Sequence, residues 1–291
     1  FSGEVYGLIT QAKYELEFRV LSDQQLGFSL NATAVRGAFN RLFLNYWCDA
    51  AETFHGFGTQ FSYVNFKGLR VPVVVSEQGV GRGLQPVTAI LNWGGNGAGG
   101  YWYTSYAPKP GYITNQNRSV LFENSEVMYF DLRNSEAVIV EAWASGVHGR
   151  ILAGDSMLDL VEQITEVTGR MRPLPRWSQE GAVVGLEGGT KTVAEIVEKM
   201  WKLGTPIKGI WLQDWVGMRH SYDGDRLVWN WELNTDYYPG WHGMMESWKD
   251  RDIRVMTYVN PFFSDPTNFT TPRHNYFQEG IDRGFFVRTA S

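Results

Sequence analysis

The chain has 291 residues, of which 43% are hydrophobic and 15% aromatic, and its formal net charge is −5. This length and hydrophobic content fit one large or two ordinary domains with sizeable cores. The Lys and Arg residues are scattered and form no basic face, and the longest apolar runs, such as 71–75, are too short to cross a membrane. We therefore predict neither nucleic acid nor a membrane as a partner.

Cysteine and histidine usage points away from metal chemistry. Cys48 is the only cysteine, and the five histidines lack metal-ligand spacing, so we predict no disulfide, no metal site and no other cofactor. Sequons at Asn31, Asn117 and Asn268 favour a secretory or extracellular location, with a cytoplasmic one left open. The start at Phe1 suggests a processed chain or a piece of a longer one, and the oligomeric state is not indicated.

The first part of the chain, 1–155, consists of short runs with strand-like alternation, separated by Gly, Asn and Pro. Clear examples are 14–20, 71–76 and 137–142. Many short strands with frequent turns predict a β-sandwich domain. Residues 76–82 form a glycine-rich loop after one such strand, which would present Glu77 and Arg82 outward or serve only as a turn.

A second glycine-rich segment, 95–100, formally satisfies the dinucleotide-binding pattern G-x-G-x-x-G. That fingerprint must open a helix, whereas the strand-like residues 101–103 follow here. We interpret the segment as a flexible loop.

A helix and a linker are predicted at 156–176. Ser156 is a plausible N-cap with Asp159 three residues on, an apolar stripe lines one face, and Gly169 suits the C-terminal cap. The following 170–175 contains two prolines and reads as a stiff, extended linker.

From 177 the pattern changes to alternating strands and helices. Strands are predicted at 182–186, 207–212 and 254–259, with helices around 192–203, 241–248 and 274–279. The first of these helices is expected to begin at a capping box of Thr192 and Glu195. The fold class is therefore mixed β and α/β: a sandwich followed, over 177–291, by the first three βα units of a truncated (β/α)8 TIM barrel.

Polar residues gather around the second of these strands. Gln213 and Asp214 follow it, and Asp223-Gly224 predicts a hairpin turn that delivers Arg226 and Trp229. An amide, a guanidinium and an indole N–H all donate hydrogen bonds, which suits an anion with several oxygens. The alternative is a solvated Arg and a core Trp. Strand alternation would put the two on opposite faces, unless the strand bends or stops between them.

The motifs WLQDW and RLVWNW in this stretch resemble glycoside hydrolase family 31, and within it the sulfoquinovosidases. Two further segments, 58–82 and 183–190, match as well, and the resemblance covers the chain from about Tyr46 onward. It implies a retaining α-glycosidase that hydrolyses glycosides of sulfoquinovose, a sulfonated glucose, with Gln213, Arg226 and Trp229 binding the sulfonate.

The same resemblance implies roles for the neighbouring carboxylates. Glu77 is expected to contact the sugar, and Glu187 stands where these enzymes tend to have Gln. Glu187 and Asp214 are expected either to order the substrate or to support the residues that touch it. The nucleophile and acid/base Asp residues are expected after Ser291, so the chain alone should be inactive. The alternatives are a neutral-sugar α-glucosidase of the same family and a non-catalytic carbohydrate-binding protein or pseudoenzyme.

Overall fold

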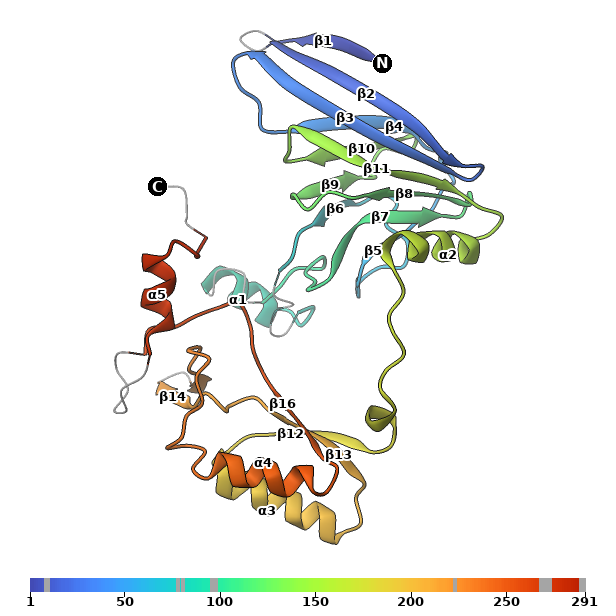
Figure 1. The fold of residues 1–291 in the computed structure, drawn as a ribbon. Helices are drawn as coiled ribbons and strands as arrows, with labels where there is room; N and C mark the ends of the chain where they lie inside the picture. Colours follow the sequence, from blue (N-terminus) through green and yellow to red (C-terminus); the bar gives the residue numbers. More distant parts are fainter. Residues whose placement is uncertain are drawn as a thin grey trace. The chain divides into compact units, whose positions relative to one another are not determined.

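A computed structural model describes residues 1–7, 11–76, 79, 82–94, 99–221, 224–266 and 274–287 (Figure 1). Contacts divide the chain into two compact units, Phe1–Arg170 and Met171–Ser291. Each unit has a hydrophobic core of its own.

The first unit is a β-sandwich. In the described residues one sheet has seven strands, in the order β1 (Ser2–Tyr6), β2 (Gln11–Ser22), β3 (Gln25–Arg36), β11 (Gly146–Ala153), β8 (Arg118–Phe122), β7 (Pro108–Thr114) and β5 (Phe54–Gly58). The other sheet has the order β4 (Leu42–Trp47), β10 (Ala137–Ala142), β9 (Met128–Asp131) and β6 (Arg70–Val73). The named strand pairs in both sheets are antiparallel, and alternate side chains of the two sheets meet in the core, as in Phe54, Phe122, Phe130 and Val140.

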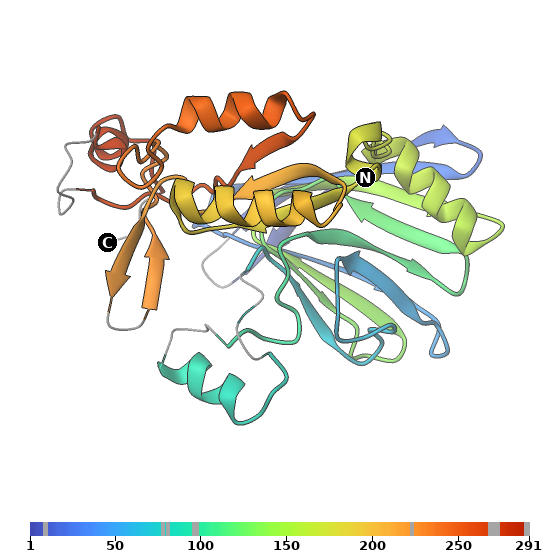
Figure 2. The same cartoon turned by 90° about the horizontal axis from the view of Figure 1, so that it is seen from below.

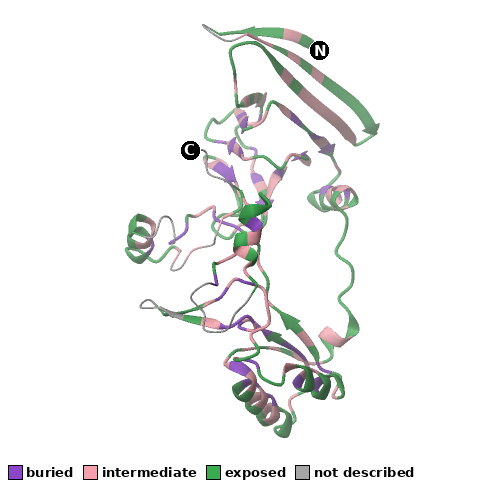
Figure 3. Ribbon diagram, turned by 60° about the vertical axis from the view of Figure 1, so that its left-hand side comes forward, coloured by how far each residue is buried: buried purple, intermediate pink, exposed green. Residues whose placement is uncertain are grey.

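The two sheets do not cover each other completely. Strands β1, β2 and β3 carry no fully buried residue, and in Figure 3 the long strands beside the N-terminus are coloured exposed and intermediate. Beneath them, next to β4, lies an open, mainly apolar groove of about 970 Å³ lined by residues such as Leu16, Phe18, Phe28 and Leu44. The sandwich therefore has a tightly packed half and a loosely covered half.

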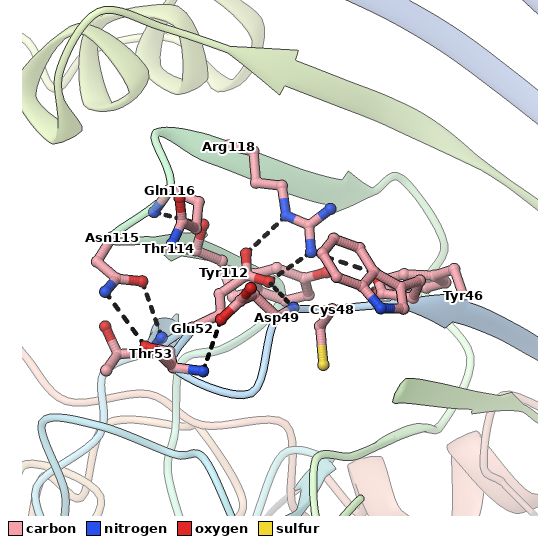
Figure 4. Close-up of polar contacts among 12 residues, drawn as sticks. Tyr46, Cys48, Asp49, Glu52, Thr53, Tyr112, Thr114, Asn115, Gln116 and Arg118 are labelled. Atoms are coloured by element: carbon pink, nitrogen blue, oxygen red, sulfur yellow. Dashed lines mark hydrogen bonds and ion pairs between the residues drawn. The ribbon is translucent and has the colours of Figure 1, made fainter. Parts of the chain in front are cut away.

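A polar cluster lies within the sandwich (Figure 4), and three of its members, Tyr46, Tyr112 and Arg118, also line the groove. Arg118 donates to both carboxylate oxygens of Glu52, from Nε to Oε1 at 2.6 Å and from Nη2 to Oε2 at 2.5 Å. The hydroxyl groups of Tyr46 and Tyr112 are 2.7 Å apart in the same cluster. These contacts compensate polar groups that the sandwich buries.

Two helices accompany the sandwich. The predicted helix at 156–169 is confirmed as α2 (Met157–Thr168): the Ser156 hydroxyl accepts from the Asp159 amide, and Leu160 is fully buried. Helix α1 (Val87–Gly94) was not expected, because its β-branched and aromatic residues are typical of strands. Trp102 and Tyr103, expected to be strand-like, lie in a turn, and 95–98 fall outside the described residues.

The second unit contains the predicted βα units. Its parallel sheet has the order β12 (Ala182–Leu186), β13 (Ile207–Leu212) and β16 (Arg254–Thr257) in the described part of the chain. These strands are followed by α3 (Gly189–Lys202), α4 (Trp241–Lys249) and α5 (Tyr276–Asp282), and a short 3₁₀ helix, η1 (Arg176–Gln179), precedes them. Apolar residues of α3, α4 and β13 form the core, including Val193, Val197, Ile210, Met244 and Trp248.

The start of α3 corrects the sequence prediction. The helix begins at Gly189 with Gly188 as its N-cap, so Thr192 and Glu195 lie inside it and form no capping box. Gly188 has φ 115° and Gly189 φ 76°. These values favour glycine, and they let the chain turn from strand to helix within two residues.

A hairpin separates β13 from α4. It consists of β14 (Met218–Ser221) and β15 (Gly224–Leu227), which pair antiparallel and form a ribbon separate from the parallel sheet (Figure 2). The predicted hairpin is confirmed by the pairing of Ser221 with Gly224, although the turn residue Asp223 lies outside the described part.

Candidate binding pocket

Three parallel strands end in polar residues at one edge of the sheet. Leu186 of β12 pairs with Leu212 of β13, and Leu212 with Thr257 of β16, so the next residues along the three strands are Glu187, Gln213 and Tyr258. All three line a pocket of about 360 Å³. The carboxyl ends of parallel strands are where barrel folds place the groups that handle a ligand.

The hairpin and the chain after it complete this pocket, which we call the strand-end pocket. Its full lining is Glu187, Gln213, Met218, Arg219, Asp225, Arg226, Leu227, Trp229 and Tyr258. The structure thus brings together four of the residues singled out in the sequence: Gln213, Arg226, Trp229 and Glu187. Tyr258 and Arg219 were missed, although Tyr258 follows its strand just as Gln213 follows β13.

Trp229 reaches the pocket because β15 stops before it. The strand ends at Leu227, the Val228 amide donates to the Gly217 carbonyl at 3.1 Å, and the Asn230 amide donates to the Val228 carbonyl at 2.7 Å. The strict alternation that would separate Arg226 from Trp229 therefore does not continue. The indole packs against the Phe262 ring, with centroids 5.6 Å apart.

Tyr258 is held in place by its neighbours. Its amide donates to the Leu212 carbonyl at 3.2 Å, and its hydroxyl accepts from the Asn260 amide group at 3.0 Å. Since that hydroxyl accepts one hydrogen bond from the protein, its own hydrogen can be donated to a ligand.

Asp214 lies behind the pocket rather than in its lining. It is fully buried, and its carboxylate accepts from the Gly188 amide at 2.7 Å and from the hydroxyl of Tyr238, which is also fully buried. Burial and this hydrogen bond raise the pKa of Tyr238 well above its usual value, so the phenol remains a donor. Asp214 thereby joins the end of β13 to the turn that carries Glu187.

Glu187 is exposed at the pocket wall. Partial desolvation, and then the negative charge of Asp214, raise the pKa of Glu187. Both effects disfavour the ionised carboxylate. Glu187 thus brings an acidic group to a pocket that Arg219 and Arg226 also line.

The remaining predictions concern other parts of the chain. Glu77 lies outside the described residues. In the described ranges no group of three or more His, Cys, Asp or Glu side chains is placed to hold a metal ion. No helix in the described part has both the length and the apolar character of a membrane span.

The chain thus combines a β-sandwich with parallel βα units of the TIM-barrel kind, and a donor-rich pocket lies at the carboxyl ends of the parallel strands. Residues 173–291 match the model of the glycosyl hydrolases family 31 TIM-barrel domain. Together with the relatives described next, this match shows that the chain belongs to glycoside hydrolase family 31.

The chain is 35% identical over 259 residues to the sulfoquinovosidase of Agrobacterium fabrum (strain C58). The aligned region is 88% of this chain and 39% of that protein. It is 29% identical to the sulfoquinovosidase of Escherichia coli (strain K12), covering 87% of this chain and 36% of the relative. The chain thus spans about two fifths of the length of these curated relatives.

A solved family 31 sulfoquinovosidase from E. rectale, in complex with an aza-sugar inhibitor, matches with a TM-score of 0.80 and 26% identity, over 98% of this chain and 42% of that one. The predicted fold, a sandwich followed by part of a (β/α)8 barrel, is therefore confirmed.

Proposed function

We propose that the chain supplies the sulfonate-binding part of a retaining α-glycosidase that hydrolyses sulfoquinovosides. The observation that carries the proposal is the gathering of Gln213, Arg226 and Trp229 in the lining of one pocket. An amide, a guanidinium and an indole offer several N–H donors and one permanent positive charge. A sulfonate needs both, because it is ionised and has three acceptor oxygens.

The sugar ring would lie toward the strand ends, against Glu187 and Tyr258. A carboxyl group and a phenol both accept and donate hydrogen bonds to sugar hydroxyl groups, which fixes the ring relative to its head group. Contact of Glu77 with the sugar stays a prediction.

Hydrolysis with retention uses two carboxyl groups about 5 to 5.5 Å apart, one as nucleophile and one as acid/base. Asp214 is unsuited to either role, because it is fully buried and both its oxygens accept hydrogen bonds from the protein. We assign it instead to holding the Gly188 turn. We expect the catalytic Asp residues outside Phe1–Ser291, so the 291-residue chain should bind the sugar without cleaving its glycosides.

Calorimetric titration of the chain with sulfoquinovose and with glucose tests the proposal. We expect sulfoquinovose to bind at least about tenfold more tightly, since one charge-assisted contact contributes on the order of 1.5–3 kcal/mol. Arg226→Ala should abolish this preference, whereas Arg172→Gln, which removes an exposed arginine outside the pocket, should keep it. Equal affinity of the unaltered chain for both sugars would favour a neutral-sugar α-glucosidase.

A further inference from the structure

The segment after β16 carries a chain of hydrogen bonds that ends at the strand-end pocket. The Phe262 amide donates to Oδ1 of Asn260 at 2.8 Å, and Nδ2 of Asn260 donates to the Tyr258 hydroxyl oxygen at 3.0 Å. Tyr258 is half-buried and lines the pocket, whereas Asn260 and Phe262 lie behind it and outside its lining. The chain of hydrogen bonds thus connects a backbone amide to the pocket wall.

The direction of these hydrogen bonds is fixed by the first donor. A backbone N–H can only donate, so the Asn260 atom that it meets is the carboxamide oxygen, and the NH₂ group of Asn260 faces Tyr258. An NH₂ group can only donate as well, so the Tyr258 oxygen accepts there and keeps its own hydrogen for another acceptor. No protein acceptor within the described ranges receives that hydrogen. Tyr258 is therefore set as a donor to a ligand in the pocket.

Two tryptophans hold the first donor in place. The Phe262 carbonyl accepts from Nε1 of Trp231 at 2.8 Å, and the Phe262 ring packs against Trp229. The Trp231 ring also contacts the Tyr258 ring edge to face, with centroids 5.9 Å apart. Because successive hydrogen bonds polarise one another, a chain anchored in this way strengthens the donor at its end.

A fixed donor determines how a sugar hydroxyl group can bind. Such a group both donates and accepts, so next to Tyr258 it has to accept and give its own hydrogen to another group. Glu187 follows the other outer strand of the parallel sheet and offers carboxyl oxygens to the same pocket. A sugar between the two strands would therefore find a donor on one side and an acceptor on the other.

We propose that Asn260 is a positioning residue for sugar recognition, which keeps the Tyr258 hydroxyl oriented as a donor to an oxygen of the sugar. This inference rests on the proposed function, in which the sugar lies against Tyr258, and deepens it by naming the residue that sets the direction of that contact. Asn260 does not touch the sugar. Its effect on binding passes through the Tyr258 hydroxyl.

The substitution Asn260→Asp reverses the direction and keeps the turn. One carboxylate oxygen can still accept from the Phe262 amide, but the other accepts from the Tyr258 hydroxyl and withdraws that hydrogen from the pocket. Asn134→Asp is a matched control in the sandwich. Oδ1 of the exposed Asn134 also accepts from the backbone amide two residues on, that of Glu136, at 2.9 Å.

The test is a double-mutant cycle of Tyr258→Phe and Asn260→Asp, measured by calorimetric titration of the 291-residue chain with sulfoquinovose and with glucose. We expect Tyr258→Phe to weaken the binding of both sugars about fivefold, the loss of one neutral hydrogen bond. The loss caused by Asn260→Asp should be about fivefold larger with Tyr258 present than in the Tyr258→Phe background. Repulsion between the new carboxylate and the sulfonate is common to both backgrounds and cancels. Asn134→Asp should bind as the unaltered chain does.

Equal losses from Asn260→Asp in the two backgrounds would overturn the inference. A fall in Tm beyond that of Asn134→Asp would overturn it as well, because it would assign Asn260 a structural role. The proposed function can fail separately: if the unaltered chain binds glucose as tightly as sulfoquinovose, the sulfonate site is refuted, whereas the cycle can still be read with either sugar. A chain that binds neither sugar would contradict both.

Discussion

Glu52 and Arg118 form the most deeply buried ion pair found in the described residues of the sandwich. The Glu52 side chain is 0% exposed and that of Arg118 is 33% exposed. Burial of a charge is costly, and the pair offsets this cost only while both partners are present. Removing only one partner should therefore destabilise the fold more than removing both.

We expect Arg118→Met to lower the free energy of unfolding by about 3–5 kcal/mol, because it leaves the Glu52 carboxylate buried without its cation. The double variant Glu52→Gln with Arg118→Met should recover a substantial part of this loss. Urea unfolding of the two single variants and the double variant measures the coupling. Losses that simply add in the double variant would contradict the assigned interaction.

Some of the pocket residues could be predicted from the sequence and others could not. Gln213, Arg226 and Trp229 could be predicted because they lie close together in the chain and their types share one chemistry. Tyr258 could not, because its place in the pocket depends on the parallel register that aligns it with Gln213. Arg219 could not either, since only the hairpin register shows that it faces Arg226.

Among the elements, the turn between β12 and α3 is the place where close backbone packing supports the pocket. Gly189 is buried, and a Cβ atom there would lie 2.6 Å from the Tyr237 carbonyl oxygen. Residue 237 precedes Tyr238, whose hydroxyl donates to Asp214. The glycine thus permits the close approach on which the wall behind the pocket depends.

We expect Gly189→Ala to destabilise the chain by more than about 2 kcal/mol, because backbone strain and a clash add together. Gly204→Ala is a matched control: φ is 77° there against 76° at Gly189, but a Cβ atom meets nothing within 4 Å. Strain alone should cost the control about 1 kcal/mol. Equal unfolding midpoints for the two variants in a thermal melt would refute the clash.

The elements themselves were largely predictable. The three parallel strands follow from apolar runs that end in polar residues, and α2 follows from its cap and stripe. The predicted start of α3 was wrong because two consecutive glycines suggest a loop, whereas Gly188 and Gly189 form the turn into the helix. Helix α1 was missed because local propensity is overridden when the surrounding chain favours another conformation.

For the molecule as a whole, the two units should respond differently to acid. In the sandwich, burial alone would raise the pKa of Glu52 and Glu141, but hydrogen bonds from Arg118 and from Trp143 and Arg70 outweigh it and lower both pKa values. In the second unit the lowered pKa values belong to Asp252 and Glu279, whose side chains are more exposed than that of Glu52, and the pKa of Glu187 is raised.

A carboxyl group whose pKa is lower in the folded state stabilises the fold above its unfolded pKa and loses this contribution as the pH falls through the folded value. A raised pKa, as for Glu187, acts in the opposite direction. Below about pH 4.5, the ordinary value for Glu, the sandwich should therefore lose stability before the βα unit does.

A deuterium pulse at one fixed pH, after incubation at a series of acidic pH values, measures this order. Amides of β8 and β11 should become labelled at a higher pH than those of β13 and α3. Arg118→Met should already show weakened sandwich protection at neutral pH. Labelling of the βα unit first, or of both units together, would contradict the prediction.

The fold class could be predicted because the two halves of the chain have different periodicities, alternation in the first and strand-helix rhythm in the second. The groove beneath β2 and β3 could not, since it arises from the unequal extent of two sheets whose pairing the sequence does not show.

The strand-end pocket also bears on how such enzymes can change their substrates. Most of its lining comes from one short segment, the hairpin between β13 and α4 and the residues just after it. If the proposed function is correct, one continuous segment binds the sulfonate head group, while a different part of the protein cleaves the glycosidic bond. Replacing the corresponding segment of a glucosidase of the same family with residues 213–229 would then transfer the preference for a sulfonated sugar and leave the catalytic residues unchanged.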